Sequence, residues 1–128
     1  MSGVQALVLF GHGARDPRWA EPMRRLAARL TAADPTMPVA LAFLEFISPD
    51  LEQACEQLVA RGVRDVRVVP VFLAGSGHVL RDLPARVQAV TARWPGLQVR
   101  IEPALGERDA VLDAMAAECL RGRRGGGR

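Results

Sequence analysis

Four short stretches of aliphatic residues alternate along the chain with longer stretches in which apolar residues recur every three or four positions. The aliphatic stretches are too continuous for half-exposed antiparallel strands, a pattern that favours strands buried on both faces of a parallel sheet. They are VQALVLF (4–10), PVALAFLE (38–45), DVRVVPVFL (65–73) and LQVRIEP (97–103).

The stretches between and after these strands predict amphipathic helices, because their apolar residues share one helical face. We expect the second helix to begin with Ser48 as N-cap and Pro49 as first residue, and to end at Gly62. The third helix is expected to begin near Asp82, which would serve as its N-cap. The inward-facing positions are Met23, Leu26, Ala27 and Leu30, then Leu51, Ala54, Cys55, Leu58 and Val59, then Leu83, Val87 and Val90, and finally Val111, Met115 and Cys119.

This alternation of strands and helices predicts an α/β fold. Short loops cannot join parallel strands, so each helix crosses over one face of the sheet in a right-handed connection. We therefore expect a three-layer αβα domain around a four-stranded parallel sheet. Pro22 should bend or delay the first helix, and Pro70 should remove one donor from the third strand.

Composition narrows the class of protein. The 128 residues correspond to one domain, and every basic side chain apart from the two histidines is an arginine. The lack of lysine excludes a Walker-type phosphate loop, a Schiff-base enzyme and pyridoxal phosphate chemistry. No apolar run approaches the roughly 18 residues of a membrane helix, and no signal peptide is recognisable, so we expect a cytoplasmic protein without membrane or nucleic-acid partners.

The two cysteines, Cys55 and Cys119, lie in predicted helices without a CxxC pair and are expected to be reduced core residues. The end of the chain differs from the rest. Residues 122–128 are rich in Arg and Gly, with nothing to bury, and are expected to be a disordered tail after a domain of residues 1–121.

Chemistry near neutral pH depends on the two histidines, since the chain has no other imidazole. His12 follows the first strand, Glu45 ends the second, and His78 lies in the glycine-rich loop after the third. The carboxyl ends of parallel strands meet at one edge of the sheet, where ligands bind in open α/β folds. Two imidazoles and a carboxylate suit cobalt, nickel, iron or zinc, and the same groups can also accept protons.

Each of these residues also has a structural interpretation. The histidines could hydrogen bond to backbone carbonyls, and Glu45 could pair with an arginine. Gly75 and Gly77 could serve only as turn residues, or could let a flat ligand approach the backbone. Arg15 and Arg81 could bind carboxylates or phosphates, or could belong to a solvated face.

The motifs GHGARDP, AFLE and VPVFLAGSGHVLRDLP, in this order and spacing, resemble the small CbiX/SirB-type chelatases of the class II chelatase family. The resemblance spans nearly the whole chain as a single chelatase-like lobe. It implies insertion of a divalent metal into sirohydrochlorin without ATP, with Co²⁺ as the first expected metal, Fe²⁺ the second and Ni²⁺ an alternative.

By this resemblance His12, His78 and Glu45 bind the metal ion and remove the pyrrole protons, so activity should fall at acid pH as the imidazoles become charged. Gly75, Gly77, Arg15 and Arg81 would contact the tetrapyrrole, which carries eight carboxylates. Larger relatives contain two lobes, so a small form implies a symmetric homodimer.

One residue departs from the family pattern, and two other functions stay open. Ala14 stands where relatives often have serine, so a hydroxyl is missing beside the first motif. A non-enzymatic metal or tetrapyrrole carrier would use the same ligands. A histidine phosphatase would normally have arginine where this chain has Gly11, and phosphoryl transfer without that cation would be poor.

Overall fold

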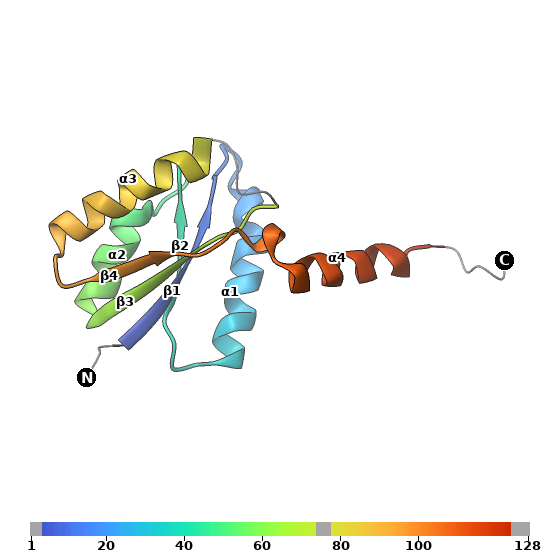
Figure 1. Ribbon diagram of the computed structural model, residues 1–128, viewed down its shortest axis with the longest axis horizontal. Coiled ribbons are helices and arrows are strands. Elements are labelled where there is room, and N and C mark those ends of the chain that lie inside the picture. The colour runs from blue at the N-terminus through green and yellow to red at the C-terminus, as the bar shows by residue number, and fades with distance from the viewer. Residues whose placement is uncertain (1–3, 74–77, 124–128) are drawn as a thin grey trace.

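The computed structural model describes residues 4–73 and 78–123, and of residues 78–80 the backbone alone. Strands and helices alternate as the hydrophobic pattern predicts (Figure 1). In chain order the elements are β1 (Val4–Gly11), the 3₁₀ turn η1 (Pro17–Ala20), α1 (Glu21–Ala33), β2 (Val39–Phe43), α2 (Leu51–Ala60), β3 (Val63–Pro70), α3 (His78–Arg93), β4 (Gln98–Ile101), the 3₁₀ turn η2 (Leu105–Glu107) and α4 (Asp109–Arg121).

The four strands form one parallel sheet in the order β2-β1-β3-β4. β1 is central, because the chain first adds β2 on one side of it and then crosses over to add β3 on the other. The strand order therefore reverses at β1 and β3. In open α/β sheets the carboxyl ends of the strands at such a switch point border the ligand crevice.

Successive residues of β1 point to opposite faces of the sheet and build two separate cores. Val8 and Phe10 pack with α2 and α3 on one face, where Leu58 and Leu83 are fully buried. On the other face Leu9 packs with α1 and η1. The predicted layers of helix, sheet and helix are therefore confirmed, and the inward positions named for the first three helices lie in these cores.

Two predicted helix starts are wrong. α2 begins at Leu51 rather than at Pro49, because the Asp50 side chain accepts a hydrogen bond from the backbone of Gln53 while the Gln53 side chain accepts one from the backbone of Asp50. α3 begins at His78, so Asp82 lies inside the helix and is not its N-cap. The predicted end of α2 is confirmed, since Gly62 follows it with a left-handed φ of 88°.

β2 and β3 are also shorter than predicted. β2 ends at Phe43 and β3 at Pro70, so the last residues of both apolar stretches belong to loops. η1 precedes α1, and Pro22 occupies the first turn of the helix, in agreement with the expected delay. Among the described residues, no helix is long and apolar enough to cross a membrane.

α4 does not lie on the sheet. It leaves η2 and extends away from the domain (Figure 1), and none of its residues is buried. Cys119 is therefore exposed, which contradicts its prediction as a core residue, whereas Cys55 is buried as expected. Burial raises the pKa of the Cys55 thiol to about 11.

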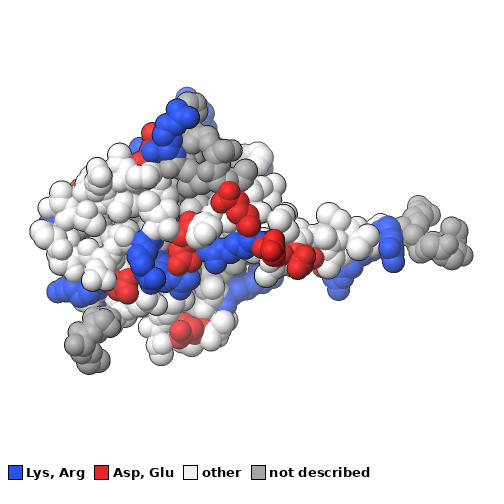
Figure 2. Space-filling model, in the orientation of Figure 1, with Lys and Arg blue, Asp and Glu red and all other residues white. Residues whose placement is uncertain are grey.

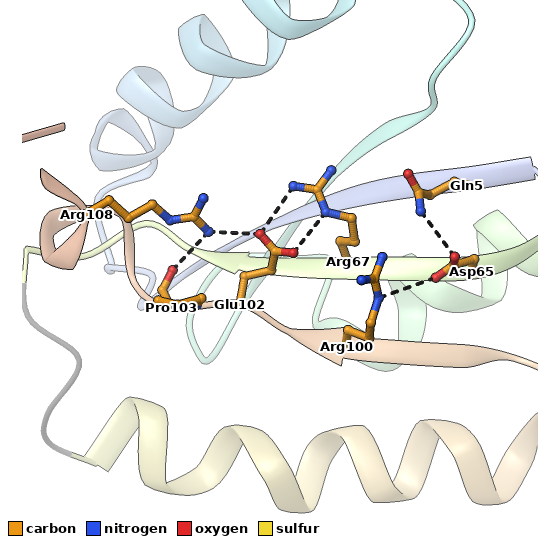
Figure 3. Close-up of polar contacts among 7 residues, drawn as sticks. All are labelled: Gln5, Asp65, Arg67, Arg100, Glu102, Pro103 and Arg108. Carbon is orange, nitrogen blue, oxygen red and sulfur yellow. Dashed lines mark hydrogen bonds and ion pairs between the residues drawn. The ribbon is translucent and has the colours of Figure 1, made fainter. Parts of the chain in front are cut away.

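The half of the sheet that α4 leaves open is charged. On the side of β3 and β4 away from α3, Asp65 and Arg67 lie beside Arg100 and Glu102 (Figure 3). In the space-filling view, acidic and basic side chains alternate in a band from this half of the sheet to the base of α4 (Figure 2). A helix packed there would bury these charges, which costs free energy unless each is paired.

Candidate functional site

The carboxyl ends of β1 and β2 hold two of the predicted site residues side by side. The strand pairing continues past both strands, because Leu44 N–H donates to the Gly11 carbonyl at 2.9 Å and Glu45 N–H donates to the His12 carbonyl at 3.1 Å. The expected meeting of His12 and Glu45 at one sheet edge is thus a consequence of backbone register.

The side chains of His12 and Glu45 form a hydrogen bond, with 2.8 Å between Nε2 and Oε2. Since an ionised carboxylate has no proton to give, the imidazole nitrogen is the donor. Both side chains are about half exposed, so the remaining imidazole nitrogen and carboxylate lone pairs can be reached by a ligand.

Gly13 allows this contact. Its φ of 93° lies in the left-handed region, and a Cβ at this position would overlap the carbonyl oxygen of Glu45. The second glycine of the GHG motif is therefore required for the close approach of the two loops. Phe46, directly after Glu45, has a φ of 70°, a left-handed conformation that is uncommon for a residue other than glycine.

A pocket of about 270 Å³ opens beside His12 at the switch point of the sheet. Its walls come from η1, the start of α1 and the ends of three strands: His12 after β1, Phe43 and Ile47 from the end of β2 and its loop, and Val71 and Phe72 after β3. These walls are largely apolar. An apolar pocket with one convergent polar group is typical of a site for an organic ligand.

The third predicted metal ligand cannot be placed with the other two. His78 is the first residue of α3 rather than part of the preceding loop, and its side chain lies outside the described residues, as do Gly75 and Gly77. Within the described part of the chain, no three His, Cys, Asp or Glu side chains gather as a metal site. The observed donor set is the pair of His12 and Glu45.

The two predicted arginine contacts differ in their surroundings. The Arg15 guanidinium lies 4.7 Å from the centre of the Phe46 ring, so it is held at the same edge as His12. Arg81 is an exposed residue in the first turn of α3. The structure thus brings Arg15 into contact with a loop of the site, and among the described residues it shows no such contact for Arg81.

Sequence reasoning missed Trp19, which lines the pocket beside His12 and is highly exposed. Its only sequence signal was its position shortly after the GHGARDP motif. A single tryptophan near an apolar segment ordinarily predicts a core residue.

A second charged cluster lies at the edge of β4. Glu102 accepts hydrogen bonds from Arg67 at 3.0 and 3.2 Å and from Arg108 at 2.9 Å (Figure 3). These two guanidiniums, Arg67 first, lower the pKa of the Glu102 carboxyl to about 2. Because Arg108 directly precedes α4, this cluster fixes the base of that helix rather than forming a ligand site.

A model of the CbiX family matches residues 6–121 of this chain. The sirohydrochlorin cobaltochelatase of Methanocaldococcus jannaschii is 37% identical over 81 residues, which cover 63% of this chain and 57% of that protein. The sirohydrochlorin ferrochelatase of Bacillus subtilis is 29% identical over 114 residues, which cover 87% of this chain and 42% of that protein.

A solved structure of a CbiX protein from Marinobacter aquaeolei VT8 has a TM-score of 0.75 and 27% identity, and the match covers 94% of this chain and 98% of that one. This chain thus spans about half the length of the curated relatives it matches, but nearly all of this solved structure. Since the family model extends from within β1 to the end of α4, the chain belongs to the CbiX family.

Proposed function

We propose that this chain inserts a divalent metal ion into sirohydrochlorin without ATP, with Co²⁺ as the first metal and Fe²⁺ as the second. The observation that carries the proposal is the pair of His12 and Glu45, whose side chains lie 2.8 Å apart and of which His12 lines an apolar pocket. The names of the curated relatives, a cobaltochelatase and a ferrochelatase, support both the substrate and the two metals.

In this proposal the arriving metal ion replaces the hydrogen bond between the two side chains, and the proton on His12 Nε2 is exchanged with water for one on Nδ1, so that Nε2 can bind the metal. A neutral imidazole and a carboxylate are suitable ligands for Co²⁺ and Fe²⁺, and two ligands leave positions open for pyrrole nitrogens. As the metal passes to the macrocycle, two pyrrole N–H protons leave, and the freed imidazole and carboxylate accept them. His78 as a third ligand stays a prediction of the sequence.

Insertion is tested under anaerobic conditions with Co²⁺, Fe²⁺ and Ni²⁺, by following the absorbance of sirohydrochlorin against protein-free controls. We expect acceleration with Co²⁺ and Fe²⁺ that is lost in His12→Ala. Insertion rates equal to those of the controls would contradict the proposal. If the protein bound the metal ion or the macrocycle without accelerating insertion, it would be a carrier.

The proposal includes a homodimer, in which two lobes enclose one cleft. α4 supports it, because Leu112, Met115 and Cys119 follow one helical stripe and are exposed to solvent. Apolar stripes of this kind are normally covered by another element. The match covers only 42% of the Bacillus subtilis ferrochelatase, so that protein has room for a second lobe within one chain.

Light scattering tests the dimer. Met115→Glu should convert a dimer into a monomer, because it places a charge on the apolar stripe. Ala117→Glu, on the opposite side of the exposed helix, should leave the mass unchanged. A monomeric wild-type chain, or a Met115→Glu variant that remains dimeric, would contradict the role of α4.

A further inference from the structure

Three consecutive strand ends each expose one large apolar side chain at the edge that holds His12. Trp19 in η1 follows β1 and is 74% exposed, Phe46 follows β2 and is 56% exposed, and Leu73 follows β3 and is 69% exposed. Single exposed apolar residues are ordinary, but three of them at one edge of a sheet, one lining a pocket, mark a surface that binds something.

Trp19 separates two pockets. It lines the pocket of about 270 Å³ beside His12, and it also lines a second pocket of about 370 Å³ with Arg18 and Pro22. A ligand that fills the space next to His12 therefore meets the indole at its border. A flat ring is suited to contact a flat unsaturated ligand at such a border.

The backbone that carries Trp19 is held in place before any ligand arrives. Asp16 caps η1, accepting from the Arg18 backbone N–H with its side chain and from the Trp19 backbone N–H with its carbonyl at 3.1 Å. Pro17 starts the turn and Pro22 follows in α1. A platform fixed in this way loses little conformational entropy on binding.

The two arginines of this loop have different partners. Arg18 forms hydrogen bonds to Asp16 at 2.6, 3.0 and 3.1 Å, so its charge is neutralised locally. Arg15 instead rests on the Phe46 ring, a contact that positions the guanidinium without neutralising it. Arg15 therefore offers a cation to an anionic group of a ligand bound beside Trp19.

We infer that Trp19 packs against the face of the tetrapyrrole macrocycle, and that Arg15, positioned by Phe46, binds one of its carboxylates. This inference rests on the proposed function and assigns the part of the site that recognises the organic substrate. His12 and Glu45 handle the metal, while η1 and the loop after β2 hold the macrocycle.

The test measures binding of metal-free uroporphyrin, an octacarboxylate macrocycle, by its absorbance shift, with no metal and no turnover. We expect Trp19→Ala to weaken binding about tenfold and Trp19→Phe to retain most of it, because the ring is kept. Val4→Ala is the control, since Val4 is an exposed apolar residue at the opposite end of β1 and should bind as wild type.

Arg15→Ala should weaken binding and reduce its dependence on salt, because one screened ion pair is lost. Arg29→Ala, on the exposed side of α1, is its control and should change neither property. Equal affinities of wild type and Trp19→Ala would overturn the inference while leaving the proposed function standing.

Two further outcomes distinguish this inference from failure of the proposed function and from a role of Trp19 in a subunit contact. If wild type does not bind the porphyrin and also fails to insert metal into sirohydrochlorin, the proposed function itself fails. If Trp19→Ala changes the mass in light scattering and not the affinity, Trp19 belongs to a subunit contact and the inference is overturned.

Discussion

Two glutamates near the carboxyl edge of the same sheet have opposite surroundings. Glu102, directly after β4, accepts three hydrogen bonds from two guanidiniums, and its side chain is 19% exposed. Glu45, two residues after β2, has one imidazole partner, and its side chain is 47% exposed. The position after a parallel strand therefore does not by itself make a carboxylate a ligand.

The partners explain the difference. A guanidinium keeps its proton at every accessible pH and cannot bind a metal ion, so the oxygens of Glu102 are committed to fixed cations. An imidazole can exchange its proton for a metal ion, and Glu45 keeps lone pairs toward solvent. The cluster around Glu102 therefore stabilises the fold, whereas the pair of His12 and Glu45 can exchange a proton for a metal ion.

The largest expected effect is the loss of metal insertion when the pair of His12 and Glu45 is broken. His12→Ala should lower the rate of metal insertion more than about 100-fold, because the imidazole ligand is lost. The free energy of unfolding should change by less than about 0.5 kcal/mol, since the side chain is half exposed. Insertion assays and urea unfolding measure the two quantities, and a variant that keeps half of the wild-type rate would refute the role of His12.

Glu45→Gln should reduce the rate by about 10- to 100-fold, because the amide lacks the negative charge that holds a cation and accepts a proton. The amide can still accept the hydrogen bond from His12, so the fold should be preserved. Direct titration with Co²⁺ should show weaker binding. An unchanged affinity for Co²⁺ would remove Glu45 from the ligand set.

A substitution in the cluster around Glu102 should lower the stability of the protein rather than its insertion rate. Glu102→Gln should lower the free energy of unfolding by about 1–3 kcal/mol, because two partly buried guanidiniums lose their counter-charge. The insertion rate per folded molecule should stay within about twofold. Arg100→Ala is the control: Arg100 lies 4.0 Å from Asp65 and is well exposed, so its loss should cost less than about 0.5 kcal/mol.

Acid should remove the same stabilisation gradually. The pKa of Glu102 is lowered from 4.5 to about 2 in the folded protein, so folding favours the ionised carboxylate. This stabilisation is complete above pH 4.5 and is lost as the pH falls toward 2. Urea unfolding of wild type and Glu102→Gln should therefore differ at pH 6 and converge near pH 2. A constant difference across this range would contradict the assigned ion pairs.

The meeting of His12 and Glu45 at one sheet edge could be predicted from the sequence, because one aliphatic stretch ends two residues before His12, another ends at Glu45, and parallel strands end together. The start of α2 could also have been read from Asp50 and Gln53, which have capping-box spacing, but the preceding Ser-Pro pair suggested an earlier start. The left-handed turn at Phe46 left no such signal, since aromatic residues seldom adopt it.

The position of α4 was harder to predict. An apolar stripe shows that a helix packs on something, and says nothing about which surface that is. The informative residues lie elsewhere, in β3 and β4, where Asp65, Arg67 and Arg100 share one face of the sheet and make it unsuitable for an apolar helix. Reading each strand face separately would have revealed this open half of the sheet.

The exposed position of Cys119 gives the molecule a natural labelling site. Cys55 is buried and its thiol holds its proton to a pKa of about 11, so a maleimide added near neutral pH reaches Cys119 alone. Because Cys119 lies on the apolar stripe of α4, subunit association would shield it and dilution would uncover it. If the proposed homodimer forms, the rate of labelling at different protein concentrations would report its assembly in the wild-type chain, without any engineered probe.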